Sequence, residues 1–233
     1  MIIQIYAFTD PDTAYQAARL GVDHIGFVAG EYGQVYGELS FSSAHEIVSI
    51  LPSGALSVAL TMSADINEIL RMAEAVQPHI IHISSDVDMV NIQKMTQLRS
   101  RLPAEIQLMK AIPVVDENSF DTAYEFAQVS DFLLLDSKQA GFPGVGATGL
   151  THDWDISRKI VKAVAVPVIL AGGLSDLNVV QAIQSVQPTG VDSNTSTNFD
   201  GSQVEKDLSK IAAFVNAVRS WERFAEQNGE AAA

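Results

Sequence analysis

A carboxylate closes one of the most apolar short segments of the chain, where Asp136 directly follows Phe132–Leu135. A run that is apolar at successive positions is typical of a strand covered on both faces. A carboxyl group at the carboxyl end of such a strand is partly desolvated, and this suits it to general acid catalysis near neutral pH. The glycine-rich stretch 141–149 follows it, and we expect its last residue, Gly149, to contact the substrate or its phosphate. The alternative is that Asp136 only caps a loop, and we favour the catalytic role.

Two glycines indicate a place where an anion can bind. Gly172 and Gly173 follow the apolar run Val168–Ala171 and precede a helix candidate. Backbone N–H groups at such a turn can hold a phosphate without any lysine or arginine. A turn without a ligand is the alternative. The next strand candidate, Gly190–Asp192, favours a phosphate because it leads into three small polar residues, Asn194, Thr195 and Ser196.

Four further polar side chains belong to strand candidates. Gln4, Tyr6 and Lys110 alternate with apolar neighbours and could point into the centre of a closed sheet. Lys110 could pair with Asp136, contact a phosphate, form a Schiff base or serve only a structural role. His82 is a candidate for substrate binding through its place on a strand. The five histidines show no metal-ligand spacing, so we expect no metal site.

The elements that must position these residues alternate between short apolar runs and longer runs of helical period. The expected strands are Ile2–Phe8, His24–Phe27, Ala55–Thr61, Ile80–Ile83, Ile106–Ile112, Phe132–Leu135, Val168–Ala171 and Gly190–Asp192. The expected helices are Asp10–Leu20, Ser42–Leu51, Ala64–Val76, Val87–Leu102, Ser119–Gln128, Trp154–Val164, Asp176–Gln184 and Lys206–Glu226.

Eight such pairs predict an α/β protein with a single (β/α)8 TIM barrel over residues 1–227 and a frayed tail over 228–233. An open doubly wound sheet is the minority alternative. The long loops Val28–Phe41 and Ser137–Asp153 would lie on the face where barrel enzymes place their active sites.

Composition excludes several functions. The formal net charge of −14 argues against a nucleic-acid partner but not against a small phosphorylated substrate. The chain has no cysteine, which excludes disulfides and thiolate chemistry. Its first residues lack a basic leader, and no apolar run is long enough to span a bilayer, so we expect a cytoplasmic protein without a membrane partner.

Several short motifs in series carry a family resemblance. They are Gly21–Phe27, Asp136, Gly146–Gly149 with Asp153 and Trp154, Leu170–Leu174 with Asn178 and Val179, Gly190–Asp192, and Lys206 with Asp207. In this order they resemble the phosphoribosylanthranilate isomerases of tryptophan biosynthesis. The resemblance implies a (β/α)8 barrel that performs a cofactor-free Amadori rearrangement. In that reaction an aminoaldose phosphate becomes an aminoketose by acid-assisted ring opening and removal of the C2′ proton.

The resemblance also implies roles for individual residues. Asp136 matches the general acid and Lys110 the lysine of the fifth strand. The phosphate-loop positions are Gly172, Gly173, Thr195 and Ser196.

Three departures concern the chemistry. The family's opening Lys-Ile-Cys-Gly reads QIYA here, so Tyr6 stands where the family has its general base, and a tyrosine with a pKa of about 10 is a poor base at neutral pH. The arginine expected to hold the anthranilate carboxylate is missing from Tyr36–Ser40. The family's Gln-Leu-His-Gly reads His82–Ser85.

The first hypothesis is therefore an isomerase of this type, with Asp136 as acid and Tyr6 or His82 where a base is needed. The alternatives are a divergent paralogue acting on another phosphosugar and a non-catalytic barrel that binds a phosphorylated metabolite. A lyase using Lys110 as a Schiff-base amine ranks last. Related barrels occur as monomers and dimers, so we expect a monomer or a homodimer.

Overall fold

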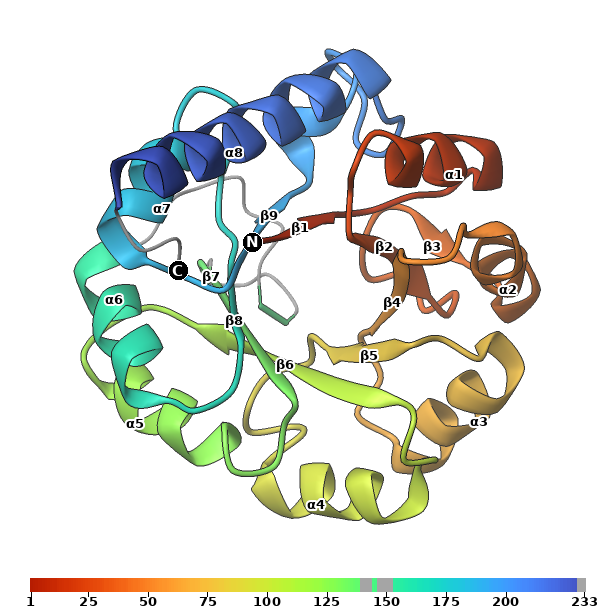
Figure 1. Ribbon diagram of the computed structural model, residues 1–233. Helices are drawn as coiled ribbons and strands as arrows, with labels where there is room; N and C mark the ends of the chain where they lie inside the picture. The colour runs from red at the N-terminus through yellow and green to blue at the C-terminus, as the bar shows by residue number, and fades with distance from the viewer. Residues whose placement is uncertain (139–143, 146–152, 230–233) are drawn as a thin grey trace.

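A computed structural model describes residues 1–138, 144–145 and 153–229 of the protein. Strands and helices alternate along the chain and form a ring of helices around a closed sheet (Figure 1). The strands are β1 (Ile2–Ile5), β2 (His24–Ala29), β3 (Glu38–Leu39), β4 (Leu56–Thr61), β5 (Ile80–Ile83), β6 (Gln107–Pro113), β7 (Phe132–Asp136), β8 (Val168–Leu170) and β9 (Gly190–Ser193). The helices are α1 (Pro11–Arg19), α2 (Phe41–Ile50), α3 (Ile66–Val76), α4 (Ile92–Arg101), α5 (Asn118–Phe126), α6 (Trp154–Ala163), α7 (Val179–Val186) and α8 (Leu208–Asn228), with a 3₁₀ turn η1 (Thr195–Thr197).

The sheet is a closed parallel barrel of eight strands. Its order is β1-β9-β8-β7-β6-β5-β4-β2, and β2 pairs back with β1, where Gln4 lies opposite His24. The short strand β3 extends the pairing of β2 beyond the end of β1. The predicted single (β/α)8 barrel is confirmed.

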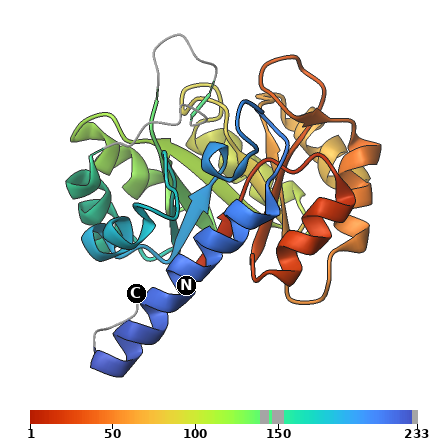
Figure 2. The ribbon, with the colours of Figure 1, turned by 90° about the horizontal axis from the view of Figure 1, so that it is seen from above.

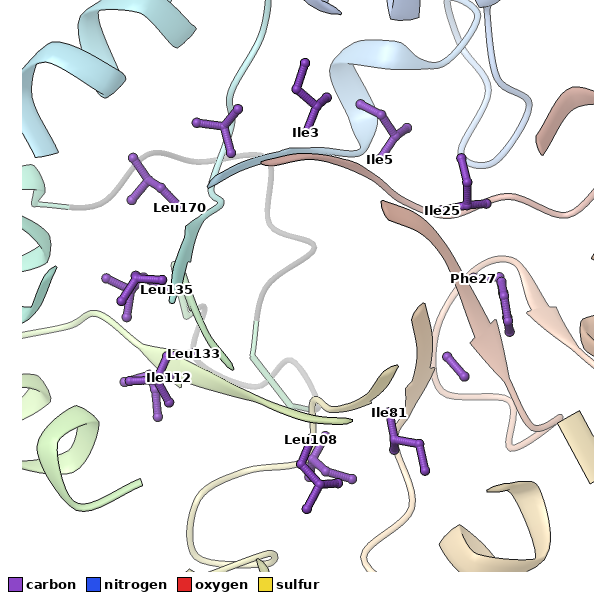
Figure 3. Packing of buried hydrophobic residues seen from close by; sticks show 14 of the residues in the cluster. Ile3, Ile5, Ile25, Phe27, Ile81, Leu108, Ile112, Leu133, Leu135 and Leu170 are labelled. Atoms are coloured by element: carbon purple, nitrogen blue, oxygen red, sulfur yellow. The ribbon is translucent and has the colours of Figure 1, made fainter. Parts of the chain in front are cut away.

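Successive side chains along each strand point to opposite faces of the barrel wall. Those pointing outward fill the layer between strands and helices, as Figure 3 shows for Ile3, Phe27, Leu108 and Leu170. Those pointing inward form a second, smaller cluster in the barrel that includes Met109. Because both faces are covered, the strands are apolar at nearly every position.

Capping residues determine where most helices begin. Six N-cap side chains accept a hydrogen bond from a backbone N–H in the first turn, and they are Asp10, Ser40, Asp65, Asn91, Asp153 and Asp207. Asn91 explains why α4 begins at Ile92 and not at Val87 as expected.

Some local features differ from the sequence-based expectation. The first strand ends at Ile5, whereas we expected Phe8, and β3 and η1 were not foreseen. Helix α8 runs along the side of the barrel and extends past the amino-terminal ends of the strands (Figure 2). It ends at Asn228, and residues 230–233 lie outside the described part of the chain, so the frayed tail stays a prediction. Among the described helices, none has the length and apolar character needed to cross a bilayer.

Candidate active site

Two adjoining cavities lie where the strands end. The large cavity has a volume of about 150 Å³ and reaches from β1 and β2 across to β7. The small cavity, of about 30 Å³, lies against the turn after β8 and the segment after β9. The two cavities share four lining residues, which are Asp136, Asp192, Asn194 and Thr195.

A turn of fixed shape forms one side of the small cavity. Gly172 and Gly173 have φ angles of 88° and 62°, a region that favours glycine. Asn178 ties the turn down, since its Oδ1 accepts from Ser175 N at 2.8 Å and its Nδ2 donates to Gly173 O at 3.0 Å. Ser193 Oγ donates to Leu174 O at 2.8 Å. The turn therefore keeps its conformation without a ligand.

A buried lysine holds the opposite side of the small cavity. Lys206 Nζ donates to Asn194 O and to Asn194 Oδ1, each at 3.0 Å, and to Asn198 Oδ1 at 2.5 Å. Burial lowers the pKa of Lys206 to about 7, while the charge of Asp192 acts in the opposite direction. Lys206 thus fixes the segment that carries Asn194 and Thr195.

Asp192 is buried at the boundary between the two cavities. Only 7% of its surface is exposed, and its Oδ1 accepts a hydrogen bond of 3.1 Å from Gln4 Nε2. Burial, followed by the neighbouring charge of Asp136, raises the pKa of this carboxyl to about 8. The hydrogen bond from Gln4 and the charge of Lys206 oppose this shift.

Tyr6 and His82 form a buried pair at the floor of the large cavity. The Tyr6 hydroxyl and His82 Nδ1 share a hydrogen bond of 2.9 Å. Burial, followed by the charge of Asp192, holds the pKa of Tyr6 well above its usual value. Burial, followed by the charge of Lys110, lowers the pKa of His82 to about 3. The low pKa keeps the imidazole neutral at physiological pH. His82 Nε2 is buried and has no hydrogen-bond partner among the described residues.

The tyrosine ring fits because the neighbouring strand carries a glycine. A Cβ atom at Gly26 would lie 2.5 Å from the Tyr6 ring. Gly26 on β2 therefore provides the space in which the aromatic ring lies.

Asp136 occupies the end of β7, as its position after the apolar run predicted. Its Oδ1 accepts from the backbone N–H of Ser137 at 2.7 Å, and the residue lines both cavities. The carboxyl group is partly exposed and faces the space where a ligand would enter.

Lys110 lies on the other face of the barrel wall, and its expected direction was wrong. It is fully buried, donates to Ser85 O at 2.6 Å and Ile83 O at 3.2 Å, and lies 5.6 Å from the centre of the Phe126 ring. It lines neither cavity and points toward the helix layer that contains Phe126. Because both faces of β6 are apolar, the sequence did not reveal which side chains point inward.

The remaining predicted residues separate into three groups. Gly172, Gly173, Asn194 and Thr195 converge on the small cavity. Ser196 lies in η1 and lines neither cavity. Gly149 lies outside the described residues.

The walls of the large cavity are mostly apolar. Val28, Leu60, Met62 and other aliphatic residues line it beside Tyr36, Ser84 and Gln203. All 14 lysines and arginines of the chain lie in its described part, and none of them lines this cavity. The missing arginine is thus not replaced by another arginine or a lysine in this structure.

Sequence reasoning did not select Asp192 or Lys206 as site residues, although both belong to motifs that were recognised. Their polarity at a strand end and before a helix was the only signal available. Their burial beside the cavities depends on closure of the barrel between β1 and β9. In the described residues, no group of three or more histidines, aspartates and glutamates is arranged to hold a metal ion.

The fold and the site define a single-barrel protein with its small-molecule site at the carboxyl ends of parallel strands. Comparison with known proteins identifies the family. The protein-family model described as "N-(5'phosphoribosyl)anthranilate (PRA) isomerase" matches residues 5–217. The chain belongs to the N-(5′-phosphoribosyl)anthranilate isomerase family, and the resemblance seen in the sequence is confirmed.

Individual relatives agree with this assignment. The N-(5′-phosphoribosyl)anthranilate isomerase 2 of Methanosarcina mazei is 33% identical over 220 residues, covering 94% of this chain and 95% of the relative. The solved phosphoribosyl anthranilate isomerase of Thermotoga maritima superposes with a TM-score of 0.76 at 24% identity, covering 94% of this chain and 100% of that one. Another solved isomerase, in complex with reduced 1-(o-carboxyphenylamino)-1-deoxyribulose 5-phosphate, has a TM-score of 0.74 at 22% identity, with coverage of 94% and 100%.

Proposed function

We propose that this protein is an isomerase that converts N-(5′-phosphoribosyl)anthranilate into the corresponding aminoketose in tryptophan biosynthesis. The observation that carries the proposal is the pair of cavities that meet at Asp136, in a chain of this family. The reaction moves hydrogen within one molecule and needs no cofactor. The family and the isomerase names of the relatives support the first hypothesis drawn from the sequence.

The small cavity is the proposed phosphate site. Backbone N–H groups at the Gly172–Gly173 turn and the polar residues Asn194 and Thr195 are suited to phosphate oxygens. Lys206 adds a positive charge behind this loop. A dianionic phosphate can therefore bind even though the net charge of the whole protein is strongly negative.

The large cavity is the proposed site of the aromatic half of the substrate. Its aliphatic walls match an aryl ring. The sugar would then lie against the four residues that line both cavities. Asp136 would donate a proton to the ring oxygen as the C1′–O bond breaks, while the lone pair of the amine forms the C1′=N bond.

The direct test is the rate at which the purified protein consumes phosphoribosylanthranilate, followed by the loss of its fluorescence. A family member that keeps the cysteine and the arginine is the control. We expect turnover clearly above the uncatalysed rate. Turnover by the control but none by this protein would contradict the proposal.

A second candidate is isomerisation of another phosphorylated sugar derivative. It is favoured by the absence of any lysine or arginine on the wall of the large cavity, since an aryl carboxylate is usually held by such a group. Substrates with an uncharged aryl amine, tested at equal concentration, distinguish the two candidates. A preference for the uncharged amine would favour this second function.

The cellular location of such an enzyme can be inferred from its substrate. A phosphorylated biosynthetic intermediate would be handled in the cytoplasm, as the sequence led us to expect. We also propose that the protein acts alone or as a homodimer, and size-exclusion chromatography with light scattering would test this.

A further inference from the structure

The proposed reaction needs a group that removes the C2′ proton, and the two residues suggested by the sequence are poorly suited to it. Tyr6 is a neutral phenol whose pKa burial raises, and its oxygen is bound to His82. His82 has a pKa of about 3 and shares Nδ1 with Tyr6. A base with so low a pKa provides little driving force for proton removal from carbon.

The geometry of the two cavities limits which residues can act as this base. A substrate with its phosphate in the small cavity and its ring in the large one must pass the residues common to both. The reacting carbons C1′ and C2′ lie between these two ends of the molecule. Of the four shared residues, Asn194 and Thr195 do not titrate in the relevant range, while Asp136 and Asp192 are carboxyls.

The barrel places these two carboxyls at the same height. Asp136 ends β7, and Leu135, one position before it, lies opposite Leu170 of β8. Leu170 in turn lies opposite Val191, one position before Asp192 on β9. The two acids therefore face the barrel centre from alternate strands, with the small side chain of Ala171 between them.

We propose that Asp192 is the general base of this enzyme and takes the place of the family's cysteine. The inference rests on the proposed isomerase function. Asp136 and Asp192 then act as an acid and a base on the same substrate.

With such a pair, every proton and electron pair is accounted for over one catalytic cycle. Asp136 gives its proton to the ring oxygen, and the nitrogen lone pair forms the C1′=N bond. The Asp192 carboxylate takes the C2′ proton, the C–H electron pair forms the C1′=C2′ bond, and the C1′=N electrons return to nitrogen. Asp192 then returns a proton to C1′ as the enol O–H gives its proton to Asp136, which leaves a C2′ ketone and restores both acids.

The surroundings of Asp192 fit this task. Asp136 at the end of β7 and Tyr6, which directly follows β1, face it, Lys206 lies beyond it, and Gln4 binds its Oδ1. Burial and the charge of Asp136 raise the pKa of Asp192 to about 8, so the two carboxyls share one proton near neutral pH. The reactive form of the pair has this proton on Asp136 and the negative charge on Asp192. Above about pH 8 both carboxyls are ionised and no proton remains for the ring oxygen, so kcat/KM should fall as the pH increases through about 8.

The experiment compares the wild-type protein with Asp192→Asn, Asp192→Glu and the exposed control Asp200→Asn. The amide oxygen introduced by Asp192→Asn can still accept from Gln4 Nε2, so the barrel closure is kept. The kinetic measurements are kcat and KM for phosphoribosylanthranilate from about pH 5.5 to 9.5, a range that brackets the titration of Asp192. Calorimetry measures the binding of reduced 1-(o-carboxyphenylamino)-1-deoxyribulose 5-phosphate, the reduced product analogue. Circular dichroism verifies the fold of each variant.

We expect Asp192→Asn to lose about 10²- to 10⁴-fold in kcat while its affinity for the analogue changes less than about tenfold. Asp192→Glu should recover part of the activity with a displaced falling limb, and Asp200→Asn should match the wild type. An Asp192→Asn variant that keeps more than a tenth of the wild-type kcat, or a wild-type profile without a fall near pH 8, would overturn the base assignment alone. Absence of wild-type turnover at every pH would instead overturn the proposed function and this inference together.

A labelled substrate gives a test that needs no variant. With deuterium at C2′, proton removal by the base should slow turnover by a primary isotope effect. If the label appears in part at C1′ of the product, a single base has carried it between the two carbons. Complete loss of the label to solvent at all pH values, even in single-turnover reactions, would contradict the return of the proton by the buried Asp192.

Discussion

Gln4 Nε2 donates a hydrogen bond of 3.1 Å to Asp192 Oδ1 across the β1–β9 pair that closes the barrel. The other end of the same amide, Gln4 Oε1, shares a hydrogen bond of 3.1 Å with His24 Nδ1. The bond from Gln4 stabilises the ionised form of Asp192, because it lowers a pKa that burial has raised.

Replacing Gln4 by methionine should therefore move the pH profile. A hydrogen bond worth about 1 kcal/mol corresponds to roughly 0.7 pKa unit, so the falling limb of kcat/KM should shift upward in pH by about this amount. The measurement is the profile of Gln4→Met beside the wild type. An unchanged limb would show that the Gln4 amide does not influence the titrating group.

Removing the Tyr6 hydroxyl should have a modest effect on catalysis. Tyr6→Phe keeps the ring over Gly26 but leaves His82 Nδ1 without its partner, which should cost about 1–3 kcal/mol of stability. Because Tyr6 is not assigned as the base, kcat should fall less than about tenfold. Chemical denaturation and steady-state kinetics measure the two effects. A loss of a thousandfold in kcat with an intact fold would return the base role to Tyr6.

The space beside Tyr6 gives a test of packing. In Gly26→Ala the new methyl would lie 2.5 Å from the tyrosine ring, so the ring must move. We expect a loss of about 1–3 kcal/mol in the free energy of unfolding, as for other overpacked sites. The double variant Gly26→Ala with Tyr6→Ala should recover part of that loss, and if it does not, the clash with the ring is not its cause.

Folding stability should depend on pH through Asp192. Its pKa is about 8 in the folded protein and near 3.8 when unfolded, so the folded state binds the proton more tightly. This contribution is fully present below about pH 4 and is lost as the pH rises through 8. Relative to Asp192→Asn, the wild type should therefore lose at least about 1 kcal/mol between pH 5 and 9. Urea unfolding of both proteins at the two pH values measures this, and a constant difference would contradict the raised pKa.

Much of the fold was visible in the sequence, because alternating apolar runs and helical periods define eight βα units. Asp136 and the Gly172–Gly173 turn were found for the same reason, since a carboxylate or a pair of glycines directly after a buried strand interrupts the apolar pattern. The direction of Lys110 could not be predicted, because the apolar residues on both sides of it, Met109 and Ala111, do not show which face of the strand lies inside the barrel. Which side chains point inward is decided only by how the whole barrel closes.

The role of Asp192 could not be predicted from the sequence either. Its partners, Gln4 and Asp136, are far from it in the chain, since Gln4 is 188 positions away, and neither spacing contains any signal. Its burial, and therefore its raised pKa, is a property of the closed barrel. A sequence pattern can propose that an acid ends a strand, whereas the ionisation of that acid depends on neighbours brought together by folding.

The most direct test of the proposed isomerase is turnover of phosphoribosylanthranilate by the wild type and by Asp136→Asn, measured together with binding of the reduced product analogue. The general acid assignment predicts a wild-type rate clearly above background, a loss of at least about a hundredfold in kcat for the variant, and nearly unchanged affinity for the analogue. Retained activity in Asp136→Asn would contradict the role of Asp136 in ring opening, on which the proposed mechanism depends.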